Sequence, residues 1–203
     1  MKAFGHILVV AAAALCTAGC TKPATDWTET EKDLINARDA VMRVLTIDNP
    51  EDTAVLRGSA SWLSTDDILS KEYSRLAGKM ISTVTSPEQD GVGIAGPQVG
   101  ISRRIVAVQR MDKEGEPFEV YPNISIVGTR GDKVSGPEGC LSVPGKRGEV
   151  SRYRDIDIKY TSTESLRDTV EHIEGFTAVI FQHEIDHLVG IIYTDKADSI
   201  SGE

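Results

Sequence analysis

The segment 175–188 limits the fold and the chemistry of this 203-residue chain more than any other stretch. Its apolar and imidazole side chains recur at helical spacing, and Gly190 is a suitable stop, so we expect a helix here. One stripe of that helix carries Phe176, Ile180, His183 and His187. Residues four apart lie on the same face, so both imidazoles can reach one metal ion in a partly buried site.

Cys140 is the best candidate for a third ligand, although on its own it could equally be a small buried hydrophobe. One thiolate and two imidazoles would leave the fourth position of a zinc-like ion open for water, which is typical of a catalytic site. Glu184, next to a ligand, can accept a proton from that water and donate it to a leaving amine. We interpret Asp186 as the partner of an arginine such as Arg152 rather than as a ligand.

Residues 1–19 have the organisation of an export signal, with a basic residue, a short apolar run and small residues before Cys20. The ending resembles a bacterial lipoprotein signal, which predicts that Cys20 is acylated and anchors the protein to a membrane of the cell envelope. Simple secretion and a cytoplasmic product that starts at Met42 are the alternatives. Cys16 would leave with the signal, so Cys140 could form no intramolecular disulfide and would stay available as a thiolate.

The length fits one catalytic domain over 41–197, preceded by a tether with a short helix over 20–40 and followed by a tail over 198–203. The helical spacing of Leu34, Val41 and Leu45 predicts an amphipathic helix over 29–45. A second helix should begin at Ser64, with a buried stripe of Leu69, Tyr73, Leu76, Met80 and Val84. Short apolar or alternating runs predict strands over 105–108, 118–127, 153–160 and 169–173. Strands between early and late helices indicate an α+β domain.

The formal net charge of −9 argues against a nucleic-acid partner, because phosphate contacts need a clustered basic surface. No basic block occurs in the chain. The only adjacent basic pairs are Arg103 with Arg104 and Lys146 with Arg147. We expect both pairs to be solvated surface.

The glycine-rich segment 91–100 formally matches the dinucleotide fingerprint G-x-G-x-x-G. Its context is wrong for that function, because a helix rather than a strand precedes it and no βαβ unit follows. The glycines more plausibly allow a ligand backbone to approach closely. Gln98 would then place a neutral amide donor near the reacting centre.

Three segments together resemble the peptide deformylase family, namely 91–100, 138–142 and 182–190, which match its motifs in order and spacing. The likeness extends over roughly 41–197. One position departs from the family pattern, since Gly96 stands where the first motif usually has alanine. We expect this change to loosen a loop without removing a catalytic atom.

The resemblance implies the α+β deformylase fold, with sheets packed around the metal-binding helix. It also implies one divalent ion, usually Fe(II) and replaceable by Zn(II) or Ni(II), bound by Cys140, His183 and His187. Water activated by the ion and Glu184 would attack the formyl carbon of an N-formylmethionyl peptide. The products would be formate and a free amino terminus.

The same resemblance implies roles for groups around the substrate. The Gln98 side chain and the Leu141 backbone amide would stabilise the oxyanion together with the metal. Neither group titrates near neutral pH, which suits them to developing negative charge. Gly93 and Gly139 would let the peptide backbone pass close to the loops, and Arg147 would lie near the downstream substrate backbone.

Two other functions remain open at this point. The helix motif could belong to an HExxH endopeptidase, although a cysteine ligand is unusual for that class. The chain could instead be an envelope protein that keeps the deformylase fold to bind metal or formyl-peptides without turnover. The oligomeric state is not readable, and we favour a monomer.

Overall fold

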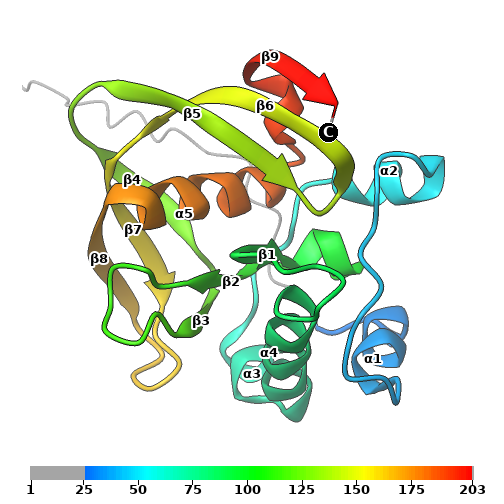
Figure 1. Ribbon diagram of the computed structural model, residues 1–203. Coiled ribbons are helices and arrows are strands. Elements are labelled where there is room, and N and C mark those ends of the chain that lie inside the picture. Colours follow the sequence, from blue (N-terminus) through cyan, green and yellow to red (C-terminus); the bar gives the residue numbers. More distant parts are fainter. Residues whose placement is uncertain (1–25, 203) are drawn as a thin grey trace, which may run out of the picture.

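A computed structural model describes residues 26–202 as three small antiparallel sheets gathered around one helix, α5 (Gly175–His187) (Figure 1). The other helices are α1 (Glu29–Asn36), α2 (Pro50–Leu56), α3 (Thr65–Leu69) and α4 (Lys71–Val84), with 3₁₀ turns η1 (Gly96–Val99) and η2 (Tyr193–Asp195). The strands are β1 (Gly93–Ala95), β2 (Ile105–Gln109), β3 (Phe118–Pro122), β4 (Ser125–Thr129), β5 (Lys133–Cys140), β6 (Val143–Tyr153), β7 (Asp155–Thr161), β8 (Asp168–Glu174) and β9 (Ala197–Gly202).

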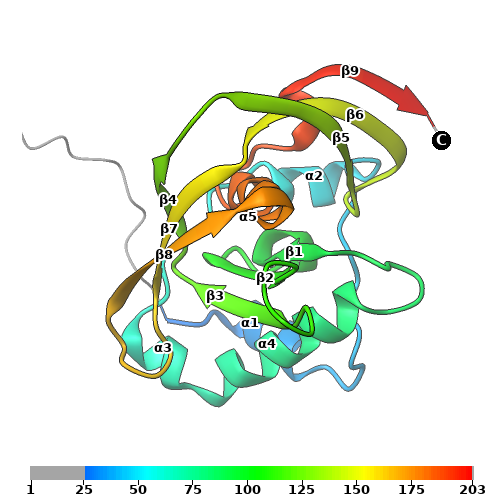
Figure 2. The same cartoon turned by 60° about the vertical axis from the view of Figure 1, so that its left-hand side comes forward.

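The sheets have the strand orders β1-β2-β3, β4-β7-β8 and β5-β6-β9. Figure 2 looks close to the axis of α5 and shows that the three sheets enclose it. A helix in this position needs apolar side chains on most of its surface, and ten of its thirteen residues are buried. The expected α+β fold, with sheets packed around the central helix, is confirmed.

The N-terminal helix is shorter than predicted. α1 ends at Asn36, and Leu34 and Val41 of the expected stripe are exposed, whereas Ile35 is fully buried. Beyond Asn36 the chain is not helical, because other parts of the domain supply hydrogen-bond partners for its backbone N–H groups. The Met42 N–H donates to Thr83 Oγ1 (2.8 Å), and the Leu45 N–H donates to the Gln98 carbonyl (2.8 Å). Tertiary contacts thus override the helical pattern after Asn36.

The second predicted helix is two helices, because Ser70 between α3 and α4 has an extended backbone (φ −75°, ψ 161°). Its hydroxyl accepts the Tyr73 N–H (3.1 Å) and caps α4, and it also accepts Trp27 Nε1–H (3.1 Å). Leu69 is consequently 63% exposed, so its place in the predicted stripe is wrong. The remaining stripe residues are buried as expected, namely Tyr73, Leu76, Met80 and Val84.

Strand prediction succeeded where apolar residues are dense. The run 105–108 lies in β2, and the runs 153–160 and 169–173 correspond to β7 and β8, which pair with each other. The predicted strand 118–127 is two strands in different sheets, because Asn123 has a positive φ of 57° between them. Residues 198–202, which the sequence places in a tail, pair with β6 as part of β9.

The prediction that Arg103 and Arg104 are solvated surface residues is wrong, since both side chains are buried. Arg103 forms an ion pair with Glu31 of α1, and Arg104 stacks 4.7 Å from the Trp62 ring centroid. Lys146 and Arg147 are exposed, as expected. Burial of a guanidinium is tolerated where a carboxylate or an aromatic ring replaces water.

The predicted signal segment, with Cys16 and Cys20, lies outside the described residues. Within the range 26–202, none of the helices has the length and apolar composition needed to span a bilayer.

Candidate metal centre and active site

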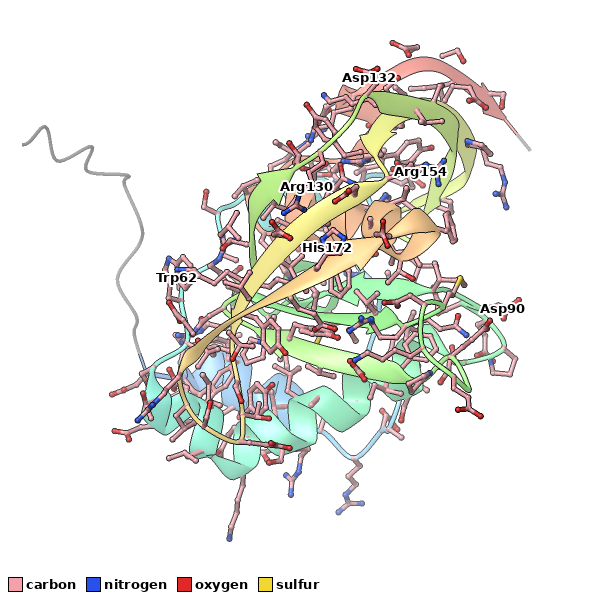
Figure 3. All side chains as sticks on the ribbon, turned by 90° about the vertical axis from the view of Figure 1, so that its left-hand side faces the viewer. Trp62, Asp90, Arg130, Asp132, Arg154 and His172 are labelled. Atoms are coloured by element: carbon pink, nitrogen blue, oxygen red, sulfur yellow. The ribbon has the colours of Figure 1, made fainter. Side chains whose placement is uncertain are left out.

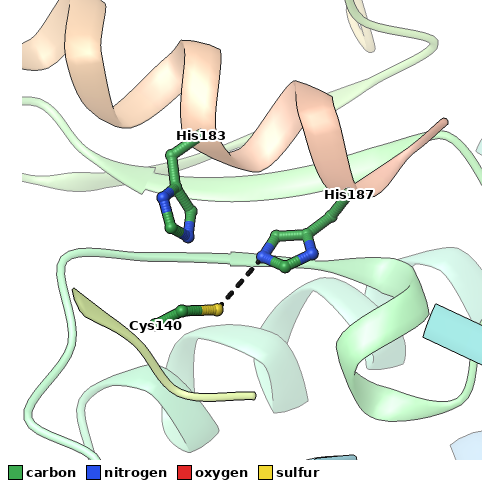
Figure 4. A group of neighbouring side chains, drawn as sticks. All are labelled: Cys140, His183 and His187. Carbon is green, nitrogen blue, oxygen red and sulfur yellow. Dashed lines mark hydrogen bonds between the residues drawn. The ribbon is translucent and has the colours of Figure 1, made fainter. Parts of the chain in front are cut away.

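The structure brings together the three predicted metal ligands. Cys140 is the last residue of β5, and His183 and His187 lie one turn apart on α5 (Figure 4). The Cys140 Sγ lies 3.3 Å from His187 Nε2, and one ligand atom from each residue lies within 4.8 Å of the others. Both imidazoles are buried, so the site is as enclosed as the apolar stripe predicts.

The electrostatics of this cluster favour metal binding. Burial opposes ionisation of Cys140, but the neighbouring His187 and His183 outweigh it and hold the pKa of the thiol well below its usual value. A thiolate is therefore available as a ligand. One soft sulfur and two imidazole nitrogens are a donor set that suits Zn(II), Fe(II) or Ni(II), so these residues fit a divalent transition metal.

A chain of ion pairs leads from His183 toward the surface. Glu138 Oε2 lies 2.8 Å from His183 Nδ1, and Arg152 donates to both carboxylate oxygens of Glu138, with Nε–Oε1 2.7 Å and Nη2–Oε2 3.0 Å. Burial opposes ionisation of Glu138, but the hydrogen bonds from His183 and Arg152 lower its pKa to about 2. A permanently ionised Glu138 holds the Nδ1–H tautomer of His183, which leaves Nε2 for the metal.

The outer part of this chain confirms the predicted partner of Asp186. Arg152 Nη1 donates to Asp186 Oδ2, and Lys196 Nζ lies 2.7 Å from each oxygen of the same carboxylate. The role of Glu138 was missed by sequence reasoning. Its position two residues before Cys140 could have indicated it, because alternate residues of a strand share a face.

Glu184 is buried beside the ligands and has no hydrogen-bond partner for Oε2 among the described residues. Burial raises its pKa to about 7. Gly93 of β1 faces this carboxylate so closely that a Cβ at position 93 would lie 2.6 Å from Glu184 Oε1. The glycine is therefore required by the side chain of Glu184.

The amide of Gln98 also points into the site. Its Oε1 accepts the Ala95 N–H (2.8 Å), and its Nε2 lies 3.2 Å from Ser142 Oγ and 3.6 Å from Cys140 Sγ. The acceptor side of the amide is thus occupied by the backbone, and the donor side faces the metal ligands. This orientation places a neutral donor where negative charge would develop.

A groove with a volume of about 580 Å³ opens onto the ligands. The groove is lined by all three predicted substrate-contacting residues, Gly93, Gly139 and Arg147. Leu141, which is predicted to stabilise the oxyanion, also lines it. One wall is apolar and comes from the first turns of α5, with Phe176, Val179 and Ile180. The groove therefore combines an apolar recess with convergent polar groups, as small-molecule and peptide sites usually do.

The expectation for Gly96 is wrong. A Cβ at this position would lie 2.6 Å from the Ile101 carbonyl oxygen and 2.8 Å from the Arg103 carbonyl oxygen. The glycine permits close packing of η1 against the following turn, rather than loosening the loop.

A second group of possible ligands consists of Asp155, His172 and Glu174 on the paired strands β7 and β8. His172 lies on the outer face of their sheet (Figure 3). Arg130 donates to Asp155 (3.0 Å) and also to Asp157 (2.6 Å). Asp155 is thus already paired with a cation, and the group lies outside the groove, so we assign no metal to it.

Comparison with known proteins agrees with this geometry. Residues 41–203 match the family model described as polypeptide deformylase. A peptide deformylase of Leptospira biflexa is 38% identical over 79% of this chain and 89% of its own length. One of Desulforudis audaxviator is 41% identical over 65% of this chain and 82% of its own length.

Solved structures agree as well. A peptide deformylase of Acinetobacter baumannii with bound Met-Ala-Ser has a TM-score of 0.67 and 34% identity, covering 77% of this chain and 98% of that one. The peptide deformylase of Thermotoga maritima has a TM-score of 0.67 and 31% identity over 78% of this chain and 99% of that chain. None of these matches supports an endopeptidase or a binding protein without turnover. The chain belongs to the polypeptide deformylase family, metal-dependent enzymes that remove the formyl group from N-formylmethionyl peptides.

Proposed function

We propose that Cys140, His183 and His187 hold one divalent ion, that this ion is Fe(II) in the cell, and that Zn(II) or Ni(II) can replace it. The donor set and the low pKa of the Cys140 thiol support a transition metal. The choice of Fe(II) follows from what the family resemblance implies. Metal analysis of protein purified from cells without oxygen tests the choice of Fe(II), and a preparation that contains zinc and no iron would contradict it.

The residues around the ligands divide the chemistry among them. When bound, the ion would supply Lewis-acid chemistry, namely polarisation of the formyl carbonyl and activation of water as a nucleophile at neutral pH. Glu184 accepts the proton of the attacking water and later donates it to the leaving amine, for which a pKa of about 7 is well matched. The Gln98 amide and the Leu141 N–H donate to the formyl oxygen as it gains negative charge.

The substrate is an N-formylmethionyl peptide that lies along the groove. The methionine side chain packs on the apolar wall of Phe176, Val179 and Ile180. Gly139 supports passage of the peptide backbone, because even a Cβ there would have no neighbour closer than 3.9 Å. The A. baumannii enzyme binds Met-Ala-Ser, which is the deformylated form of such a peptide. Arg147 lies on the rim of the groove and contacts the downstream backbone.

The single observation that carries this function is the buried Glu184 carboxylate beside the ligand cluster and open to the groove. Residues 21–203, loaded with Fe(II) or Ni(II) without oxygen, should release formate from formyl-Met-Ala-Ser. Glu184→Gln should retain the metal and lose about 10³-fold in kcat, within the range for a general base. Metal-loaded protein that releases no formate would overturn the proposal.

The protein is anchored to the cell envelope through lipid on Cys20 and acts as a monomer. Contacts of residues 27–35 support a product that begins upstream of Met42. Trp27 and Ile35 belong to the buried core, and Glu31 pairs with the buried Arg103. A start at Met42 would remove all three side chains. Mass spectrometry of the native N-terminus tests the anchor, and light scattering of the delipidated protein tests the monomer.

A further inference from the structure

The hydroxyl group of Ser142 lies directly beside the amide of Gln98. Ser142 is fully buried, Gln98 is almost fully buried, and the distance from Gln98 Nε2 to Ser142 Oγ is 3.2 Å. Ser142 binds no metal ligand atom and has no role in the chemistry described above. Among the described residues, the side-chain hydrogen bond of Ser142 is thus with a group that would stabilise the oxyanion.

A primary amide has two N–H groups that diverge by about 120°, so fixing one of them fixes the direction of the other. One Gln98 N–H is directed to Ser142 Oγ. The other then points toward the metal ligands, where Cys140 Sγ lies 3.6 Å from Nε2. Gln98 Oε1 is held separately by the Ala95 N–H, which prevents the amide from turning over.

The segment 45–47 fixes the backbones of Gln98 and Ser142 relative to each other. The Leu45 N–H donates to the Gln98 carbonyl (2.8 Å), and the Ile47 N–H donates to the Ser142 carbonyl (3.0 Å). Leu45 and Ile47 are only two residues apart, so a single short segment binds both backbones. The backbones on both sides of the hydrogen bond are therefore anchored to one support, and the contact between the side chains is preorganised.

We propose that Ser142 is a positioning residue, whose hydroxyl oxygen accepts one N–H of Gln98 and so aims the other N–H at the formyl oxygen. The inference rests on the proposed role of Gln98 in the deformylase reaction. Ser142 acts only through Gln98 and touches neither substrate nor metal. Its contribution should consequently be present in the transition state and absent from substrate binding.

Ser142→Ala tests this role in the metal-loaded chain with formyl-Met-Ala-Ser. We expect kcat to fall about 10-fold, less than the 10²–10³-fold typical for complete loss of an oxyanion donor. KM and bound metal should stay within twofold of the wild type. Ser86→Ala is a matched control, because Ser86 is also buried but its hydroxyl has no hydrogen-bond partner among the described residues. This control should keep its kcat.

A double-mutant cycle separates positioning from a general structural effect. In a Gln98→Ala background, the further change Ser142→Ala should leave kcat unchanged, because the group that it positions is gone. A loosened fold would instead lower kcat and metal content in both backgrounds. Unchanged kcat in Ser142→Ala, or additive losses in the double variant, would overturn the inference. Formate release by the wild type, measured in parallel, shows separately whether the deformylase function itself holds.

Discussion

In the described part of the chain, two arginine–glutamate pairs have both side chains buried, and they differ in the other contacts of the glutamate. Arg152 donates to Glu138 (Nε–Oε1 2.7 Å). The other oxygen of Glu138, Oε2, lies 2.8 Å from Nδ1 of the metal ligand His183. Arg103 donates to Glu31 with the same geometry (Nε–Oε1 2.7 Å). The other partner of Glu31 is the backbone N–H of Thr28 (2.8 Å), the N-cap of α1.

The same ion pair thus serves catalysis in one place and architecture in the other. The Arg152 pair fixes the tautomer of an imidazole that must bind metal. Glu31 of the other pair completes the capping box of α1, and its ion pair with Arg103 holds this helix on the domain. Each pair is expected to be costly to break, because removal of the carboxylate takes the main charged partner from a buried guanidinium. Only loss of the Arg152 pair should affect activity, and four experiments test this contrast.

Glu138→Ala should have the largest effect. It leaves Arg152 buried with half of its partners and His183 Nδ1 without an acceptor. We expect the free energy of unfolding to fall by about 3–5 kcal/mol, as for other broken buried pairs. Zinc affinity, measured by competition with a chelator, should fall about 10–100-fold. Glu149→Ala, an exposed glutamate on β6, is the control and should change neither quantity.

Glu31→Ala should destabilise the fold without affecting the metal site. We expect a loss of about 3 kcal/mol in urea unfolding, at the low end of the range for buried pairs. The guanidinium of Arg103 keeps its stacking on Trp27, 5.1 Å from the ring centroid, which limits the loss. Zinc affinity and kcat should remain within twofold of the wild type. A loss of zinc affinity as large as that of Glu138→Ala would show that the two pairs are coupled.

The two pairs also show why the site was more predictable than its surroundings. The ligands and Glu184 follow from helical spacing, and Asp186 could be matched to Arg152 because an acid on the metal helix needs a cation. Nothing local distinguishes Arg103 from a surface arginine, since its partner lies 72 residues away in sequence. The strands β5 and β6 were missed for a related reason. They have many exposed and glycine positions, and pairing with each other rather than an apolar pattern defines them.

The pH dependence of stability should reveal the Arg103 pair separately. Burial opposes ionisation of Glu31, but hydrogen bonds from Arg103 and Thr28 outweigh it and lower its pKa below the ordinary value of 4.5. The unfolded chain therefore binds a proton at a higher pH than the folded chain does. The stabilisation is present above pH 4.5 and is lost as the pH falls through the folded pKa.

The contribution of the Glu31 charge to stability can be measured with Glu31→Gln, because glutamine cannot ionise. The difference in unfolding free energy between wild type and variant should be constant from pH 6 to 8 and shrink below about pH 4.5. The pair at Glu138 is present in both proteins and cancels from the comparison. A difference that stays constant down to pH 3 would show that the charge of Glu31 does not stabilise the fold.

Lys196→Ala should have the smallest effect, although Lys196 ends the same chain of contacts that holds His183. Its ammonium group lies 2.7 Å from both oxygens of Asp186, but the side chain is 40% exposed, so water can replace most of what the ion pair contributes. Exposed ion pairs contribute about 0.5 kcal/mol, and salt should reduce this further. Asp186 keeps its bond to the buried Arg152, so zinc affinity should stay within twofold. A tenfold loss of zinc affinity in Lys196→Ala would contradict this expectation. It would mean that the exposed ammonium group affects the metal ligand His183 through three intervening side chains, and that Lys196 belongs to the group of residues that supports metal binding.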